Sequence, residues 1–240
     1  PYPLAQKRQV LESGEAPEGY EGDFTRDQEA LREEQLVRRT VFVEFSRRLT
    51  AVAESNKTGN GGSQHAVPSI SPMWADLRFD FGGAPIFYPL RQLHFQNADF
   101  ASTTFYGPAD FFGATFHGDT SFSAAQFTAD ASFQGANFTD WVGFSAAHFA
   151  GAATFSGARF ADAASFATVT FTGEADFSDA VFSAAADFAV STFKSDADFS
   201  RLNTEGIASF AAITFDGKAV FTASTFHDEA HLACPLYPSP

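Results

Sequence analysis

The sequence has 240 residues, a formal net charge of −14 from 29 acids and 15 bases, and 31 Phe, more than its Leu, Ile and Val together. A content of 45% hydrophobic and 18% charged residues is typical of a soluble, folded chain and argues against intrinsic disorder. The negative charge argues against a nucleic-acid-binding surface and favours either solubility alone or a partner with a basic face. A single Cys, Cys234, excludes an intrachain disulfide framework and a cysteine-based zinc site, so we expect a cytoplasmic protein. No apolar run reaches the roughly 18 to 20 residues that a membrane-spanning helix requires.

Residues 1–71 are expected to form an N-terminal segment with one amphipathic helix over about 25–54. The sequence begins at Pro1 without an initiator Met or a signal segment, which suggests a piece of a longer protein. A capping box from Thr25 to Gln28 would begin the helix, with Phe24 as its hydrophobic staple. The expected apolar stripe is formed by Leu31, Val37, Val41, Phe45, Leu49 and Val52. We expect this helix to pack on the rest of the chain, and the alternative is that it forms a homodimer.

Two further segments separate this helix from the second half of the chain. Residues 56–63 are rich in Gly and Asn and predict a flexible linker. Residues 72–94 contain several aromatic residues interrupted by Pro72, Pro85 and Pro89. We expect an irregular aromatic cap here, because the repetitive segment that follows needs a cover at its open end.

The Phe residues after position 94 follow a fixed spacing. They number 25 of the 31, and from Phe100 to Phe226 consecutive positions alternate between steps of five and six residues. Thr204 is the one interruption, and Leu232 stands where the next Phe would fall. With Thr204 included, the positions from Phe100 to Phe226 number 24. The residue two before each of them is Ala in 16 cases and Thr, Val or Ser in six more. The pattern is an internal 11-residue repeat, made of one step of each length.

The repeat must be assigned to a helix or to strands. An 11-residue period also occurs in right-handed helical coiled coils. On such a helix the two Phe of one unit would lie about 140° apart, and no single apolar stripe would form. The spacing of two residues between Ala and Phe, as in Ala175 to Phe177, is instead that of a β-strand. Short strands joined by Gly, Ser and Asp turns must pair with the equivalent strand of the next coil, about 4.8 Å away, which predicts a β-solenoid.

The segment over about 95–232 resembles the pentapeptide-repeat family in its Phe-centred form, in which steps of five and six residues alternate. The resemblance implies a mainly β fold, a right-handed quadrilateral β-helix in which two 11-residue units make one 22-residue coil. We therefore expect about six coils, a rod of roughly 29 Å, with the N-terminal helix and the aromatic cap before it and a tail over 233–240 after it. The extra residue at every second step should bulge two opposite corners of each coil.

The loss of a Phe ring at position 204 is expected to be compensated by a neighbouring residue. A large residue, Leu202, occupies the usual Ala position just where the usual Phe is replaced by Thr204. Compensation of core volume is the interpretation we prefer, because a close-packed interior tolerates volume-conserving changes best. The alternative is a binding notch.

A 22-residue coil predicts that equivalent residues of successive coils stack on one another. Three of the four bases after Phe95 then meet an acid: Lys194 with Asp216, Arg201 with Asp179, and Lys218 with Asp196. Opposite charges that face each other across paired strands are favourable.

The acidic residues are the surface feature of the repeat that indicates a function. After Phe95 there are 16 acids and four bases, a net −12, whereas residues 1–94 have a net −2. Like-charge neighbours are unfavourable unless cations or a basic partner neutralise them. The same stacking gives a candidate partner-binding surface of four carboxylates on one face and two elsewhere: Glu174, Asp176, Asp196 and Asp198, with Asp140 over Asp162.

Two functions fit this surface. The first is a non-enzymatic structural or protein-interaction module. The second is implied by the resemblance, because some pentapeptide-repeat proteins imitate duplex DNA and bind type II topoisomerases such as gyrase. Duplex DNA carries one charge per roughly 1.7 Å, or about 17 over this rod. The expected partner is in either case a protein, with no direct nucleic-acid binding.

The sequence contains no motif that would predict catalysis, a metal or a cofactor. His227 and His231 are interrupted by acids near the end of the sequence, and a solvated turn is the preferred interpretation there. A column of Thr170, Thr192 and Thr214 suggests an ice-binding face, but Gln126 and His148 interrupt the column in the coils before them. We therefore expect no enzyme.

Overall fold

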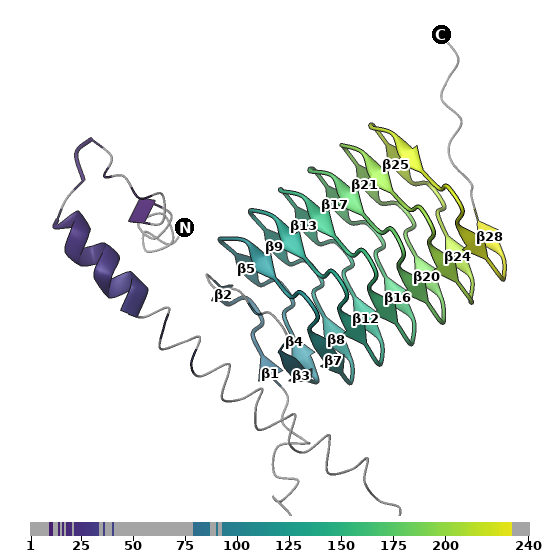
Figure 1. The fold of residues 1–240 in the computed structure, drawn as a ribbon, viewed down its shortest axis with the longest axis horizontal. Helices are drawn as coiled ribbons and strands as arrows, with labels where there is room; N and C mark the ends of the chain where they lie inside the picture. Colours follow the sequence, from purple (N-terminus) through teal and green to yellow (C-terminus); the bar gives the residue numbers. More distant parts are fainter. Residues whose placement is uncertain are drawn as a thin grey trace, which may run out of the picture.

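The computed structural model describes residues 10–11, 14, 16, 18–20, 22–33, 36, 40, 79–86, 90 and 93–231. Its second half is a β-solenoid of short parallel strands, shown as a row of coils in Figure 1. Each coil contributes one strand to each of four sheets, which we call faces 1 to 4 in chain order. The mainly β, four-sided fold expected from the repeat is therefore confirmed.

The strands of faces 1 and 3 begin at the small inward residue of the repeat in nearly every coil. Face 1 consists of β1 (Phe79–Asp80), β4 (Ala98–Asp99), β8 (Thr120–Ser121), β12 (Val142–Gly143), β16 (Ala164–Ser165), β20 (Ala186–Asp187), β24 (Ala208–Ser209) and β28 (Ala230–His231). Face 3 consists of β6 (Ala109–Asp110), β10 (Ala131–Ser132), β14 (Ala153–Thr154), β18 (Ala175–Asp176), β22 (Ala197–Asp198) and β26 (Ala219–Val220).

On faces 2 and 4 most strands instead end at the inward Phe. Face 2 consists of β2 (Pro85–Ile86), β5 (Thr104–Phe105), β9 (Gln126–Phe127), β13 (His148–Phe149), β17 (Thr170–Phe171), β21 (Thr192–Phe193) and β25 (Thr214–Phe215). Face 4 consists of β3 (His94–Gln96), β7 (Thr115–His117), β11 (Asn137–Phe138), β15 (Arg159–Phe160), β19 (Val181–Phe182), β23 (Asn203–Thr204) and β27 (Thr225–Phe226).

The register of the strand pairs gives the coil length directly. Ala131 pairs with Ala153 on face 3, and Phe138 pairs with Phe160 on face 4, so each partner is one 22-residue coil away. The same offset holds from β4 to β28, which corresponds to six coils over residues 98–229. Coil length and coil number thus agree with the expectation from the sequence.

The corners of each coil alternate between two forms. Between faces 1 and 2, and again between faces 3 and 4, the residue after the turn donates to the preceding Phe carbonyl, as Thr103 N does to Phe100 O at 3.1 Å. The second residue after that Phe has a positive φ, 56° at Ser102 and 63° at Gly135, as a type II turn requires. The other two corners contain one more residue and lack this turn, so the wider corners lie opposite each other, as the alternating steps predict.

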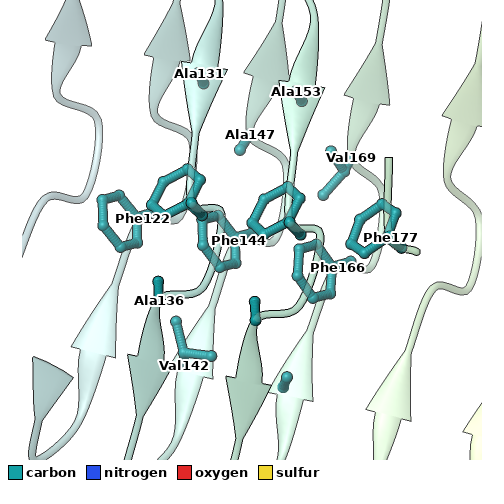
Figure 2. Packing of buried hydrophobic residues seen from close by; sticks show 14 of the residues in the cluster. Phe122, Ala131, Ala136, Val142, Phe144, Ala147, Ala153, Phe166, Val169 and Phe177 are labelled. Carbon is teal, nitrogen blue, oxygen red and sulfur yellow. The ribbon is translucent and has the colours of Figure 1, made fainter. Parts of the chain in front are cut away.

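Phe rings fill the core in four rows along the rod. Within one row, rings of successive coils stack face to face, as Phe122 and Phe144 do with centroids 4.9 Å apart (Figure 2). Rings from faces 1 and 3 meet edge to face, as Phe133 and Phe144 do at 5.3 Å and 86°. Both arrangements are favoured by the quadrupole of the ring, and alternation with small Ala residues leaves room for them.

Position 204 is filled by packing. Leu202 and Thr204 are both fully buried, and Thr204 keeps the regular register, pairing with Phe182 in the preceding coil and Phe226 in the next. The Thr204 hydroxyl is buried without a hydrogen-bond partner, which is a destabilising feature of this coil. The structure therefore supports volume compensation and shows no notch at this site.

Within the segment expected to be an irregular cap, the described residues pair with the first regular coil as a further coil would. The strand β1 pairs with β4, and Phe81 stacks on Phe100 with centroids 4.8 Å apart. The strand β2 pairs Ile86 with Phe105, and Leu90 N donates to Asp110 O at 2.8 Å. The register offsets in this segment are shorter than one regular coil on faces 1, 2 and 4, so the spacing of the sequence does not reveal it as a repeat.

The N-terminal helix begins one residue earlier than the sequence predicted. Residues 24–33 are helical, and Asp23 is the N-cap because its Oδ1 accepts the N–H of Arg26 at 3.1 Å. The predicted capping box is therefore wrong, and Thr25 lies in the first helical turn. Tyr20 packs edge to face on Phe24 with centroids 5.1 Å apart. The expected continuation to residue 54, the linker, and packing of the helix on the solenoid depend on residues outside the described set and stay predictions.

In the described part of the chain, no helix has both the length and the apolar character needed to cross a bilayer.

Candidate interaction surface

The four carboxylates expected on one face do come together on face 3. Asp176 in β18 pairs with Asp198 in β22, so the two residues lie one above the other on adjacent coils. Glu174 and Asp196 each precede one of these strands by one residue, at the wide corner between faces 2 and 3. We call these four residues the face 3 acidic cluster.

Backbone N–H groups hold three of the four carboxylates. Asp176 Oδ1 accepts the N–H of Ser178 at 2.8 Å, and Asp198 Oδ1 accepts that of Ser200 at 2.7 Å. These are Asx-type bonds that stabilise the following turn. Asp196 Oδ1 instead accepts the N–H of Lys218 in the next coil at 2.9 Å. Each of these carboxylates therefore has a structural role in addition to its charge.

This role of Asp recurs along the whole solenoid. At least ten of the 16 acids after Phe95 accept a backbone N–H through a carboxylate oxygen: Asp99, Asp110, Asp130, Asp140, Asp162, Asp176, Asp187, Asp196, Asp198 and Asp228. Ser and Thr replace Asp at the equivalent position of other coils, as Thr154 does toward Ser156 N at 3.3 Å. Turn stabilisation thus explains much of the acidity of the segment, and the hydroxyl alternatives show that the turn itself does not require the charge.

Arg201 borders the face 3 acidic cluster. It binds Asp179 of the preceding coil through two hydrogen bonds of 2.6 Å, and this pairing lowers the pKa of Asp179 and raises the pKa of Arg201. The charges of Asp198 and Asp176 also raise the pKa of Arg201. More than half of each partner side chain is exposed, so the ion pair contributes little to stability.

The other two stacking pairs behave differently from Arg201 and Asp179. Lys218 meets Asp196 through its backbone N–H at 2.9 Å rather than through its ammonium group. Within the described coils, Lys194 and Asp216 form no ion pair. Counting by whole coils therefore placed all three pairs correctly in register, but only one of them forms a side-chain ion pair.

Asp140 and Asp162 lie on the opposite edge of the rod. Both stand at the wide corner between faces 4 and 1, where Asp140 Oδ2 accepts the hydroxyl of Thr139 at 2.7 Å and the N–H of Gly118 at 2.8 Å. These two bonds, the hydroxyl first, lower the pKa of Asp140. Asp162 Oδ1 accepts the N–H of Ala163 at 2.7 Å. The six candidate residues therefore form two separate groups rather than one surface.

The two corners that border face 1 carry exposed apolar side chains that the sequence reasoning did not single out. Val190 is 57% exposed at a tight corner, and Ile207 and Trp141 are 44% and 38% exposed at the wide corner before face 1. Trp141 lies over Gly143, where a Cβ would collide with the indole ring. Trp141 and Ile207 are three coils apart in one column, so a count by whole coils would have found the alignment.

The remaining polar candidates do not form a cluster that suggests chemistry. Thr170, Thr192 and Thr214 pair in register on face 2, and His148 occupies the same column one coil before Thr170. His148 Nε2 lies 3.2 Å from the hydroxyl of Thr172. Among the described residues, no three His, Cys, Asp or Glu side chains are grouped so that they could hold a metal ion.

Comparison with known proteins identifies the repeat itself. Residues 100–148 and 144–189 match the family described as pentapeptide repeats (9 copies). No curated protein and no solved structure matches the chain significantly.

Proposed function

From the match of residues 100–189 to the pentapeptide-repeat family, we propose that the chain is a rigid protein-interaction module. Its face 3 acidic cluster would bind a basic surface of a partner protein. The observation that carries the proposal is the in-register pair of Asp176 and Asp198, flanked by Glu174 and Asp196 on the same two coils. Such like-charge neighbours are unfavourable in isolation and favourable beside cations.

Fixed carboxylates are well suited to this role. The backbone N–H groups of Ser178, Ser200 and Lys218 hold three of the four carboxylates in place before any partner arrives. Binding to preorganised groups loses less conformational entropy than binding to mobile side chains. Each of these bonds uses one carboxylate oxygen, and the second oxygen can accept a bond from a guanidinium or ammonium group.

The charges around the face 3 acidic cluster favour binding of one specific protein over nonspecific attraction of any basic protein. Arg201 and Lys218 lie within or beside the cluster, so this part of face 3 is not uniformly negative. Alternating signs of charge fix the register of a partner and disfavour wrong partners. A partner surface with bases opposite the carboxylates would satisfy this arrangement, because Asp179 already pairs with Arg201.

Removal of the four charges without removal of the acceptors tests the proposal. The variant Glu174→Gln/Asp176→Asn/Asp196→Asn/Asp198→Asn retains an oxygen for each backbone N–H, so the solenoid is expected to fold normally. A matched control removes four charges at the diagonally opposite corner, through Asp119→Asn, Asp140→Asn, Asp162→Asn and Asp228→Asn. Immobilised wild type, variant and control are compared for partner capture from a lysate, followed by affinity measurements with the purified partner.

The proposal expects a partner that binds the wild type and the control and is lost with the face 3 variant. Its affinity should also fall with rising salt, because the contact is between exposed charges. Partners that bind all three proteins equally would show that this cluster is not the interface.

Imitation of duplex DNA is a second candidate, and the charge density favours it. A net −12 on the segment after Phe95 compares with about 17 phosphates on duplex DNA of equal length, at one charge per roughly 1.7 Å. The target would then be a DNA-binding enzyme such as a type II topoisomerase. Gyrase supercoiling in the presence of excess wild type decides the question, since a mimic alters supercoiling and competes with DNA for the enzyme. Unchanged supercoiling and no competition would exclude gyrase as the target.

A further inference from the structure

We propose that face 1 is the contact surface of a weak homodimer, in which two copies of the chain pack antiparallel about a twofold axis between β16 and β20. The contact covers the four coils from β12 to β24 and the two corners that border face 1 there, which we call the face 1 patch. Face 1 lies on the side of the rod opposite face 3, so the dimer leaves the face 3 acidic cluster of both copies free.

Exposed apolar side chains gather at the borders of the face 1 patch. Trp141, Val190 and Ile207 are three of the four large apolar residues that are exposed in the described part of the chain. The indole of Trp141 lies over Gly143 on the face itself, where a Cβ would collide with it. Exposed apolar side chains that gather on one side of a protein are typical of an interaction surface.

The face 1 patch is almost free of charge. Its four corner-to-corner runs, 141–147, 163–169, 185–191 and 207–213, contain one charged residue, Asp187. The equivalent runs on face 3, 152–158, 174–180, 196–202 and 218–224, contain seven. Two copies with a net −12 on the segment after Phe95 repel each other, and the repulsion is smaller where few charges meet. A second copy can therefore approach face 1 more easily than face 3.

The residues of the face 1 patch are arranged in a self-complementary way. The strands follow one another in the order β12, β16, β20 and β24, so the proposed axis places β12 opposite β24 of the second copy and β16 opposite its β20. Trp141, which precedes β12, then meets Ile207, which precedes β24, and this contact occurs twice. At the other border Val190 meets the exposed Thr168. A parallel arrangement would instead place Trp141 against the small Ala146.

The same axis gives the one charge of the patch a hydrogen-bond donor. Asp187 in β20 lies opposite Ser165 in β16 of the second copy. Asp187 Oδ1 accepts the N–H of Ala189 at 2.9 Å, so its second oxygen can accept the hydroxyl of that Ser165. The Ser145 hydroxyl lies 2.9 Å from the Ser165 hydroxyl of its own chain and can donate to it in turn. The two Asp187 carboxylates therefore face hydroxyl groups and do not face each other.

The size of the face 1 patch predicts weak association. Four coils at about 4.8 Å span about 19 Å, and one side of a coil is about four extended residues, or about 13 Å, wide. The product of about 250 Å² is well below the roughly 800 Å² per partner of standard interfaces, so we expect a dissociation constant between about 10 μM and 1 mM. Asp119 and Glu229 limit the patch, because they stand in the column of Trp141 and Ile207 on either side and would face each other in the dimer.

Analytical ultracentrifugation of the full chain between about 5 μM and about 1 mM measures the association. We expect dimers that accumulate with concentration. The dimer should become tighter when the salt concentration rises from about 0.05 M to about 0.5 M, because salt screens the repulsion between two acidic chains. This salt response is opposite to that expected for a protein bound to the face 3 acidic cluster, so the two proposals can fail separately. A monomer at every concentration and salt would overturn the dimer.

An exchange of charges tests the register of the contact. Trp141→Glu and Ile207→Lys should each weaken the dimer at least about tenfold, since each places a charge against an apolar side chain. In a mixture of the two variants, the heterodimer keeps one native contact and pairs the two introduced charges at the other. We expect the heterodimer to be at least about fivefold tighter than the dimer of either variant alone.

Gln134→Lys is the matched control for an added charge. Gln134 is exposed at the corner between faces 3 and 4, so this variant should dimerise like the wild type when measured at high salt. Far-UV circular dichroism establishes that all three variants are folded. A dimer that neither Trp141→Glu nor Ile207→Lys weakens would place the contact elsewhere and overturn the proposal. A mixture that associates no more tightly than its components would show that the two positions do not meet, which would overturn it too.

Discussion

A double-mutant cycle at Leu202 and Thr204 is the sharpest test of how the core is built. In the regular coils of face 4 the inward pair is a small residue and a Phe, as Ala180 and Phe182 are in the coil before. Here the volumes are exchanged, and both side chains are fully buried. The cycle consists of Leu202→Ala, Thr204→Phe and the two together.

Each single change should be destabilising for an opposite reason. Leu202→Ala leaves a cavity, because the short Thr204 fills little of the vacated volume, and costs about 2 to 5 kcal/mol of unfolding free energy. Thr204→Phe adds a ring to a space that Leu202 already fills, and overpacking costs about 1 to 3 kcal/mol. Independent sites would give a double variant destabilised by the sum.

The double variant should instead be at least as stable as the wild type. It restores the regular small residue and Phe, and the new ring can stack between Phe182 and Phe226, the residues that pair with position 204. It also removes a buried hydroxyl that has no hydrogen-bond partner in the structure. The restored stacking contributes about 0.5 to 1.5 kcal/mol, and loss of the unsatisfied group contributes about 1 to 3 kcal/mol. The coupling energy should therefore exceed about 3 kcal/mol, at the upper end for residues in contact.

Chemical denaturation followed by circular dichroism measures the four free energies. Amide hydrogen exchange at residues 203 and 205 reports whether the change is confined to this coil. A double variant as unstable as the sum of the single variants would refute the interpretation that the two positions share one core volume.

Three further predictions concern single positions. Val190 holds a β-branched residue at a φ of 61°, so Val190→Asn should stabilise the protein by about 1 kcal/mol, measured as a higher Tm. At Gly151 a Cβ would lie 2.6 Å from backbone atoms of the preceding coil, so Gly151→Ala should lower the free energy of unfolding by about 2 to 3 kcal/mol. Gly157 lies at an open corner with a φ of 65°, so Gly157→Ala should lower it by about 1 kcal/mol in the same denaturation assay. Burial and the imidazole of His117 lower the pKa of His94 from 6.5. The unfolded chain therefore binds more protons, and the free energy of unfolding should fall as the pH drops below about 6.5. In denaturation at several pH values, His94→Asn should remove this part of the pH dependence, whereas the control His227→Asn should retain it.

The regular part of the fold could be predicted because one physical constraint repeats. A Phe and a small residue two positions apart define an inward pair, and alternating steps of five and six close a four-sided 22-residue coil. Coil number, register and the stacking of Asp176 on Asp198 all follow from that count, and the structure confirms them.

The parts that escaped prediction are those where the same geometry is made by other residues. Phe81, Ile86 and Leu90 build the first coil with offsets shorter than those of the regular coils, so no periodicity marks them. At the N-terminal helix, Asp23 and Thr25 are both good N-caps by residue type, and only the backbone bond to Arg26 decides between them.

The candidate surface was predictable in position but not in bonding. Register arithmetic located Glu174, Asp176, Asp196 and Asp198 on one face. That a carboxylate such as Asp176 supports the turn two residues later depends on side-chain rotamer and turn geometry, which a column count does not include.

The alternation of corner types gives the rod an approximate twofold screw along its axis. Faces 1 and 3 are built by the same half of the repeat, and faces 2 and 4 by the other half. Insertion or deletion of one 11-residue unit would therefore preserve every inward position while turning all downstream surfaces by half a revolution. A gene encoding such a chain can move a cluster like that at Glu174 and Asp196 to the far side of the rod in one event, without rebuilding the core. Evolution can thus set the angle between a binding surface upstream of the changed site and one downstream of it, independently of the packing that keeps the rod folded.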